Sequence, residues 1–388
     1  MERLIRYGNI DSIPYYNCSW RTSEEWDLQG LKRPILGWFL VLFGGFVEIL
    51  YLPILYIIFK TKLIRYACYK LIVFLTLTDM SATVCSSIIS GVLYIKGSVF
   101  CSYPTFEYIA GGFAINTWCM ACAINISLFA NRVCSIAFHE YIDVIEGKLT
   151  YFCITISAIY GTFILFYTPI ICFNSKALAW IPEPLSEIDD SKESEKYVMG
   201  FLENIERKYK NSNKKVLVIK VHKLYKFWNN VKNVESIIKI KLYNNDWQSW
   251  NNYLFVAIMF FLYITYCVLI KKLAHGQKSK KSRAIFIQCC IICFFNTATA
   301  LIYNALSLMT PALWILYLGQ LSWSLNHGCP AIIYLTMNDT IRKNFFRTFC
   351  RFKNTVSLLR NKGIVNRIEF AEDRYNEQRT SGTAGSIT

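Results

Sequence analysis

Three ionisable side chains, Glu48, Asp79 and His327, interrupt long apolar stretches of this 388-residue chain. A membrane enzyme would need a nucleophile, an acid–base set or a metal triad at one depth, which His327 alone does not supply. Ionisable groups inside a membrane usually face the interior of a helix bundle and mark a functional site. Asp79 lies four residues after Leu75, on the same helix face. We therefore expect an interior polar site without enzymatic activity, with a buried structural acid as the alternative.

The fifteen cysteines could in principle hold metal ions or form a disulfide framework. Cys119 and Cys122 have the spacing of a metal-binding pair, as do Cys290 and Cys293, but no second pair follows either at the spacing that zinc requires. Cysteines within apolar stretches behave as small hydrophobic residues, and these are Cys85, Cys119, Cys122, Cys153, Cys267, Cys289, Cys290 and Cys293. No metal and no cofactor is predicted.

Two motifs could serve a conformational switch. Asn131 and Arg132 end one apolar stretch, where the arginine could bind a partner or merely extend toward the membrane surface. Pro330 interrupts the last apolar stretch, and Tyr334 follows one turn later. A proline within a membrane helix frees a backbone carbonyl and makes a hinge.

A short amphipathic segment follows that hinge. Phe345, Phe346 and Phe349 share one helix face, with arginines opposite, which predicts a helix lying on the membrane surface. Cys350 beside them is a candidate for palmitoylation.

The elements that must position these residues are membrane-spanning helices. The chain is 54% hydrophobic and only 18% charged, whereas soluble domains carry about 25% charged residues. A bilayer core of about 30 Å requires about 20 apolar residues as helix. Seven stretches meet this requirement, so the predicted fold is an all-α seven-helix membrane bundle with spans at about 35–59, 71–95, 106–130, 150–173, 252–270, 285–308 and 312–337.

The distribution of Lys and Arg sets the orientation. Basic residues are concentrated after the first span, between the fifth and sixth, and after the seventh, which places those loops in the cytoplasm. Residues 1–34 are then extracellular and carry no signal peptide, residues 35–340 form the bundle, and residues 341–388 form a cytoplasmic tail. Asn17-Cys-Ser is a glycosylation sequence on the outer side. The net charge of +16 is explained by the concentration of Lys and Arg in cytoplasmic loops, where these residues can contact anionic lipid. No binding of nucleic acid is therefore expected.

The loop between the fourth and fifth spans carries an insert at about 187–241, rich in Lys, Asn, Ile and Glu. Such a segment cannot bury enough apolar area to offset its chain entropy, so we expect it to be weakly ordered. Its composition also suits translated AT-rich, non-coding sequence, and we interpret it as an error in the gene model. A lid over the ligand-binding site is the alternative.

An outer disulfide is expected at Cys101, at the mouth of the third span. Cys18 in the N-terminal segment is the expected partner, because both lie in the oxidising compartment in this topology. Cys172, near the outer end of the fourth span, is the rival partner, since the loop from Asn174 to Asn251 contains no cysteine.

The order of these motifs resembles the rhodopsin-like G-protein-coupled receptors, with departures. Asn131-Arg132-Val133 stands where Asp-Arg-Tyr is usual, the Pro330–Tyr334 motif is one residue too long, and the sixth span has no proline. The chain more closely resembles the nematode serpentine receptors of class T, which are chemoreceptors. The resemblance covers nearly the whole chain apart from the insert and the distal tail, in Tyr16-Asn-Cys-Ser19 with Glu25-Trp26, CYKLIVFLTLTDM, FCSYPTFEYIAG, WCMACAINISLFANR and GCPAIIYLTMNDTIRK.

The resemblance implies a cell-membrane receptor, in a plasma or sensory cilium membrane, that couples an extracellular small ligand to a cytoplasmic G protein. By motif, Asn131 and Arg132 form the switch that faces the G protein, Asp79 the interior polar site, and Pro330 with Tyr334 the hinge. Because Asn131 replaces a carboxylate, the resemblance leaves Arg132 without its usual resting partner. Outer-half aromatic and polar residues are expected to line the ligand pocket: Phe113, Asn116, Tyr303, Trp314 and Gln320.

Two other classes of protein remain as alternatives. A receptor-like protein that does not signal would fit the altered motifs. A small-solute transporter would usually show repeated topology and paired broken helices, whereas this chain has one proline-broken helix and no repeat.

Overall fold

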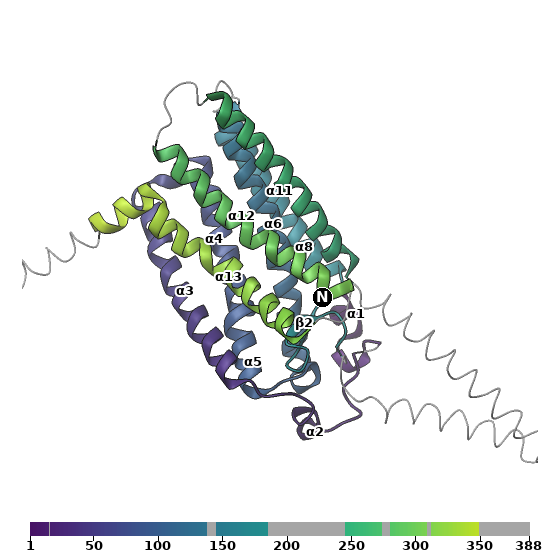
Figure 1. Cartoon of the computed structure of the whole chain (residues 1–388). Coiled ribbons are helices and arrows are strands. Elements are labelled where there is room, and N and C mark those ends of the chain that lie inside the picture. Colours follow the sequence, from purple (N-terminus) through teal and green to yellow (C-terminus); the bar gives the residue numbers. More distant parts are fainter. Residues whose placement is uncertain (15, 138–144, 185–244, 274–279, 309–311, 349–388) are drawn as a thin grey trace, which may run out of the picture.

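A computed structural model describes residues 1–14, 16–137, 145–184, 245–273, 280–308 and 312–348. Its long helices run side by side in one bundle (Figure 1). They are α3 (Pro34–Lys60), α4 (Ala67–Thr83) continued by η3 (Val84–Ile89) and α5 (Ser90–Lys96), α6 (Pro104–Ala137), α8 (Thr150–Tyr167), α11 (Asp246–Leu273), α12 (Lys280–Leu308) and α13 (Leu313–Met337). The insert at 187–241 and Cys350 lie outside the described residues.

Five helical segments among the described residues are long and apolar enough to cross a membrane. They are Pro34–Lys60, Ala67–Lys96, Pro104–Cys134, Gly147–Tyr167 and Asp246–Leu269. The apolar part of α12 is shorter, Cys290–Ala305, and α13 carries many buried polar residues. The protein is therefore a helical, multi-pass membrane protein.

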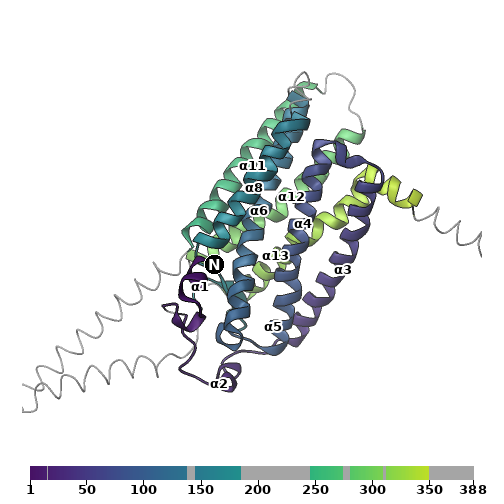
Figure 2. The same ribbon diagram turned by 180° about the vertical axis from the view of Figure 1, so that it is seen from behind.

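Contacts between the helices give the order of packing. α6 packs against α4, α8 and α11, while α3 packs against α4, α5 and α13, and α12 lies between α11 and α13. Figure 2 shows α3, α4 and α5 from behind. Gly37 and Gly91 bring α3 and α5 together, because a Cβ at Gly91 would lie 2.6 Å from the carbonyl oxygen of Gly37. Small residues allow such close approach between membrane helices.

The two ends of the bundle differ. We call the end that carries the Cys18–Cys101 disulfide and a β-hairpin the disulfide end, and the end that carries Arg132 the tail end. The hairpin consists of β1 (Cys172–Asn174) and β2 (Ala179–Ile181), paired antiparallel with Phe173 opposite Trp180. Residues 339–348 form a helix at the tail end, where the bundle continues beyond α13 (Figure 1).

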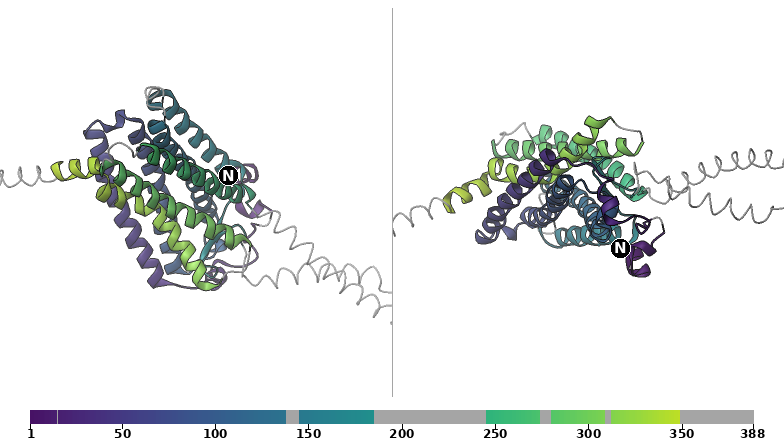
Figure 3. Two further views of the ribbon diagram at one scale, coloured as in Figure 1. Left: turned by 45° about the horizontal axis from the view of Figure 1, so that its top comes forward. Right: turned by 90° about the horizontal axis from the view of Figure 1, so that it is seen from below.

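The N-terminal segment folds as a cap on the disulfide end, which the sequence did not predict. It contains α1 (Glu2–Tyr7), η1 (Ile10–Ser12) and α2 (Ser23–Asp27), and the right-hand view of Figure 3 looks at the bundle from that end. α2 begins with a capping box, since the Thr22 side chain accepts from the Glu25 amide and the Glu25 carboxylate accepts from the Thr22 amide. Trp26 is buried and donates from Nε1 to the carbonyl of Cys18 at 2.9 Å.

Among the helix boundaries that differ from those expected, two lie at the disulfide end. α8 ends at Tyr167, not at residue 173, because Thr168 is extended and Pro169 follows, after which the chain enters β1. α11 begins at Asp246, six residues before the expected start at 252. Asn245 accounts for this early start: its Oδ1 accepts from the Gln248 amide at 3.0 Å, while its Nδ2 donates to Thr168 Oγ1 at 3.3 Å.

Candidate functional site

Asp79 and His327 form a buried pair at the centre of the bundle. Oδ1 of Asp79 on α4 lies 2.8 Å from Nδ1 of His327 on α13, and both side chains are excluded from solvent. The hydroxyl of Tyr51 on α3 donates to the carbonyl of His327 at 2.6 Å and lies 3.4 Å from Oδ2 of Asp79. Three helices are thus joined through one pair of ionisable groups.

Pro330 interrupts the backbone hydrogen bonds of α13 beside this cluster. Proline has no N–H, so it cannot satisfy the carbonyl one turn earlier in α13. Tyr51 supplies a donor to a carbonyl in that turn, at His327. Tyr334 is fully buried one turn beyond Pro330. A change at Asp79 or His327 would therefore act directly on the turn of α13 that Pro330 interrupts.

Glu48, the third intramembrane ionisable residue, lies apart from the Asp79–His327 pair. It lies one turn before Tyr51 on α3 and is half-buried. Its buried Oε1 has no hydrogen-bond partner among the described residues. The structure therefore brings together Asp79 and His327, as an interior site requires, but does not include Glu48 in their hydrogen bonds.

A second polar layer lies toward the disulfide end. The carbonyl of Ser86, within the π-helical segment η3, accepts from Gln320 Nε2 at 2.7 Å and from Ser324 Oγ at 2.9 Å. Widened π turns leave backbone groups available in this way and occur often at functional sites. Gln320, expected in the ligand pocket, instead ties α13 to the α4–α5 helix.

A small cavity of about 20 Å³ lies between these layers and the hairpin. A cavity of this size holds about one water molecule. It is lined by Ala114, Ile115, Trp118, Ile171, Gln248, Thr299, Tyr303 and Trp323. Of the expected pocket residues only Tyr303 is among them. Phe113 and Trp314 are 46% and 63% exposed on the outer surface, and Asn116 lies against Gly161 of α8.

Trp118 connects the cavity with the buried pair. Its indole ring lines the cavity and meets the imidazole of His327 edge to face, with ring centroids 6.0 Å apart. Its Nε1 donates to Oδ1 of Asn252 on α11 at 2.9 Å, and Asn252 Nδ2 donates to Oδ1 of Asn304 on α12 at 3.1 Å. A molecule that displaced Trp118 would disturb both the Asp79–His327 pair and the α11–α12 contact.

Arg132 lies at the tail end of α6, half-buried beside Asn131. Its guanidinium contacts Sγ of Cys68, at the start of α4. Tyr69 lies beside both Cys68 and Arg132 and faces Asn338 and Thr340, which follow α13. The arginine thus lies where α4, α6 and the segment after α13 meet, and the Cys68 thiol is one of its contacts.

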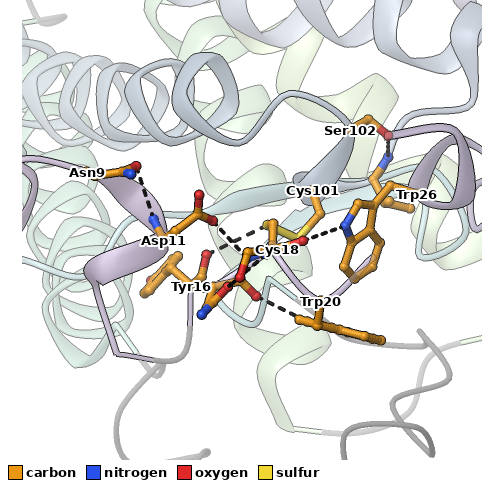
Figure 4. Close-up of a disulfide and its surroundings, with 11 residues drawn as sticks. Asn9, Asp11, Tyr16, Cys18, Trp20, Trp26, Cys101 and Ser102 are labelled. Carbon is orange, nitrogen blue, oxygen red and sulfur yellow. Dashed lines mark hydrogen bonds between the residues drawn. A yellow bond between two sulfur atoms is a disulfide. The ribbon is translucent and has the colours of Figure 1, made fainter. Parts of the chain in front are cut away.

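The disulfide end contains the cysteine pair expected from the sequence. Cys18 and Cys101 are joined, with their Cα atoms 5.4 Å apart (Figure 4), while Cys172 is a free, buried thiol in β1. Burial raises the pKa of the Cys172 thiol well above its usual value, and the nearby Glu107 raises it further. Asn17 is exposed, with Oδ1 accepting from the Ser19 hydroxyl at 2.7 Å, so the glycosylation sequence is accessible.

Glu107 and Tyr51 are buried polar residues that were not predicted from the sequence. Glu107 is completely buried on α6, beside the backbone of Phe173 in β1. Its place in Tyr-Pro-Thr-Phe-Glu, at the start of a span, suggests a membrane-surface acid, whereas in the structure it is buried beside Cys172 and Phe173 of β1. Among the residues that the structure describes, no three His, Cys, Asp or Glu side chains gather as a metal site would need.

Comparisons with known proteins agree with this architecture. The family described as "Serpentine type 7TM GPCR chemoreceptor Srt" matches residues 3–237 and 232–357, two stretches that meet within the insert. "Serpentine receptor class T-55" of Caenorhabditis elegans is 20% identical over 339 residues, covering 85% of this chain and 79% of the relative. Because the family matches nearly the whole chain, the protein belongs to the Srt family of serpentine seven-transmembrane chemoreceptors.

Proposed function

We propose that this protein is a chemosensory G-protein-coupled receptor of a plasma or sensory cilium membrane. A small ligand enters from the disulfide end, which faces outward, and a G protein binds at the tail end. α12 and α13 then complete a seven-span bundle, with their polar residues turned inward. The observation that carries the proposal is the contact of Trp118 with His327, because it joins the cavity to the Asp79–His327–Tyr51 cluster beside Pro330.

The mechanism is a shift between two helix arrangements. A ligand changes such an equilibrium only by its differential affinity for the two arrangements. The resting cavity has room for about one water molecule, so a larger ligand must favour an arrangement in which the cavity walls are further apart. Moving Trp118 would alter the packing around His327 and thereby the position of α13 relative to α3 and α4.

Expression in a heterologous cell with a second-messenger reporter tests this function. The expected result is a concentration-dependent response to some members of a panel of small chemicals. A receptor-like protein without signalling would bind such chemicals without a response, and a transporter would accumulate them across the membrane. Accumulation of a panel member without a second-messenger response would reject the receptor function.

The orientation can be checked at Asn17. The wild-type protein from eukaryotic cells is expected to lose mobility on a gel through an attached glycan, because the exposed asparagine faces the lumen during synthesis. Asn17→Gln should remove the shift, and glycosidase should remove it from the wild type. Asn338→Gln is the matched control, since its sequence Asn338-Asp-Thr340 lies at the tail end. A glycan on Asn338 would show that the orientation is the reverse of the proposed one.

Cys68 is proposed to hold Arg132 in the resting arrangement. Cys68→Ala removes the contact of the Arg132 guanidinium with α4, so the G protein competes with one interaction fewer. Loss of a single hydrogen bond to a charged group, about 1.5 kcal/mol, should raise basal nucleotide exchange about 10-fold. Cys134→Ala is the control, because this half-buried thiol also lies at the tail end of the bundle, on α6, and takes no part in a disulfide. Equal basal exchange in both variants would reject the role of Cys68.

A further inference from the structure

The lining of the cavity indicates what kind of molecule it can accept, an inference that rests on the proposed receptor function. The eight lining residues come from α6, α11, α12, α13 and the segment before β1, and none of them is charged. Burying a charged ligand there would leave its charge without a counter-ion, which is strongly unfavourable. The described lining therefore favours an uncharged molecule.

The aromatic walls add an apolar preference. The rings of Tyr303 and Trp323 meet edge to face with centroids 6.2 Å apart, and Trp118 forms a further wall on α6. Ala114, Ile115 and Ile171 supply only aliphatic surface. A ligand gains affinity here mainly by removing its own apolar surface from water.

Two polar side-chain atoms of the lining are already engaged. Trp118 Nε1 donates to Asn252, while Thr299 Oγ1 lies 2.8 Å from the carbonyl of Phe295 and 2.7 Å from Ser322 Oγ. The hydroxyl of Tyr303 is different, because it is buried and has no hydrogen-bond partner among the described residues. A phenolic hydroxyl can donate one hydrogen bond, so it provides a place for one acceptor atom.

We propose that this cavity binds small, uncharged, mainly apolar molecules that carry one hydrogen-bond acceptor, such as a ketone, and that the Tyr303 hydroxyl donates to that acceptor. The competing occupant is an amine paired with Glu107. That carboxylate lies on α6 toward the disulfide end but is packed beside Cys172 of β1 and does not line the cavity.

Direct binding to the purified full chain in lipid nanodiscs tests the proposal without requiring a signal. The probes are matched sets with the same carbon skeleton: 2-alkanones and aryl ketones, the corresponding hydrocarbons, primary amines and carboxylates, each over a range of sizes. We expect ketones of one size range to raise the melting temperature, the hydrocarbons to do so only at higher concentration, and the amines and carboxylates not to do so.

Tyr303→Phe should weaken the binding of the ketones about 3- to 10-fold, the effect of one lost hydrogen bond, while leaving the hydrocarbons unchanged. Tyr253→Phe, at an exposed tyrosine on α11, should change neither. Stabilisation by amines or carboxylates alone, by no probe at all, or a ketone affinity indifferent to Tyr303→Phe would overturn the proposal. Ketone binding without G-protein activation would instead reject only the receptor function.

Discussion

Replacing Cys101 with serine is expected to remove most of the protein from the cell surface and to lower its thermal stability markedly. The disulfide closes a loop with a sequence separation of 83 residues. In the chain-entropy treatment, opening a loop of that length destabilises the folded state by about 4–5 kcal/mol. The N-terminal cap would also lose its covalent attachment to the mouth of α6.

Surface labelling and the melting temperature of the purified protein measure this effect. Cys172→Ser is the matched control, because Cys172 is a buried cysteine of the same region that takes no part in the disulfide. The double variant Cys18→Ser/Cys101→Ser should resemble Cys101→Ser alone, since one bond is lost in each. Wild-type surface levels and melting temperature for Cys101→Ser would show that the cap is held by its packing.

Arg132→Ala is expected to abolish G-protein activation while the receptor remains folded and at the surface. The arginine lies at the tail end of α6, where the proposed partner binds. Truncating one member of a buried, hydrogen-bonded charge contact costs about 2–5 kcal/mol, so nucleotide exchange should fall by more than about 10-fold.

Two controls separate this role from a stabilising one. Arg65→Ala removes an exposed cation from the same end and should retain most of the exchange activity. Ligand affinity measured by thermal shift should change little in Arg132→Ala, because the cavity lies at the other end of α6. Undiminished exchange by Arg132→Ala would mean that the side chain only extends toward the membrane surface.

The helices, the buried ionisable residues and the disulfide could all be predicted from patterns that extend over the whole chain. Long apolar stretches indicated the helices, and the placement of cysteines indicated the pairing of Cys18 with Cys101. The rarity of intramembrane charge singled out Asp79 and His327 together with Glu48, but not which of them would pair. Each of these signals depends on the residue itself or on its position along the chain, so no knowledge of helix rotation was needed.

The lining of the cavity could not be predicted in the same way. In a membrane helix the lipid-facing side is as apolar as the side facing other helices. Periodicity therefore does not separate Phe113, which is on the outer surface, from its neighbour Ala114, which lines the cavity. For the same reason the sequence does not show that Trp314 lies on the outer surface.

The hairpin and the cap could not be predicted because contacts between residues far apart in the sequence form them. β1 and β2 contain three residues each, too few for an alternating pattern to be recognised. The burial of Glu107 depends on that hairpin, and the donation of Tyr51 to His327 joins residues 276 positions apart. Such partners become visible only when the helices are packed.

The most direct test of the account is nucleotide exchange on a purified G protein by the full chain in nanodiscs, measured with and without a probe that raises its melting temperature. The probe should accelerate exchange, and His327→Gln should uncouple the two, keeping the binding of the probe but losing the acceleration. If the probe binds and exchange stays at the rate of receptor-free nanodiscs for a series of G-protein subtypes, the protein does not transmit ligand binding to a G protein.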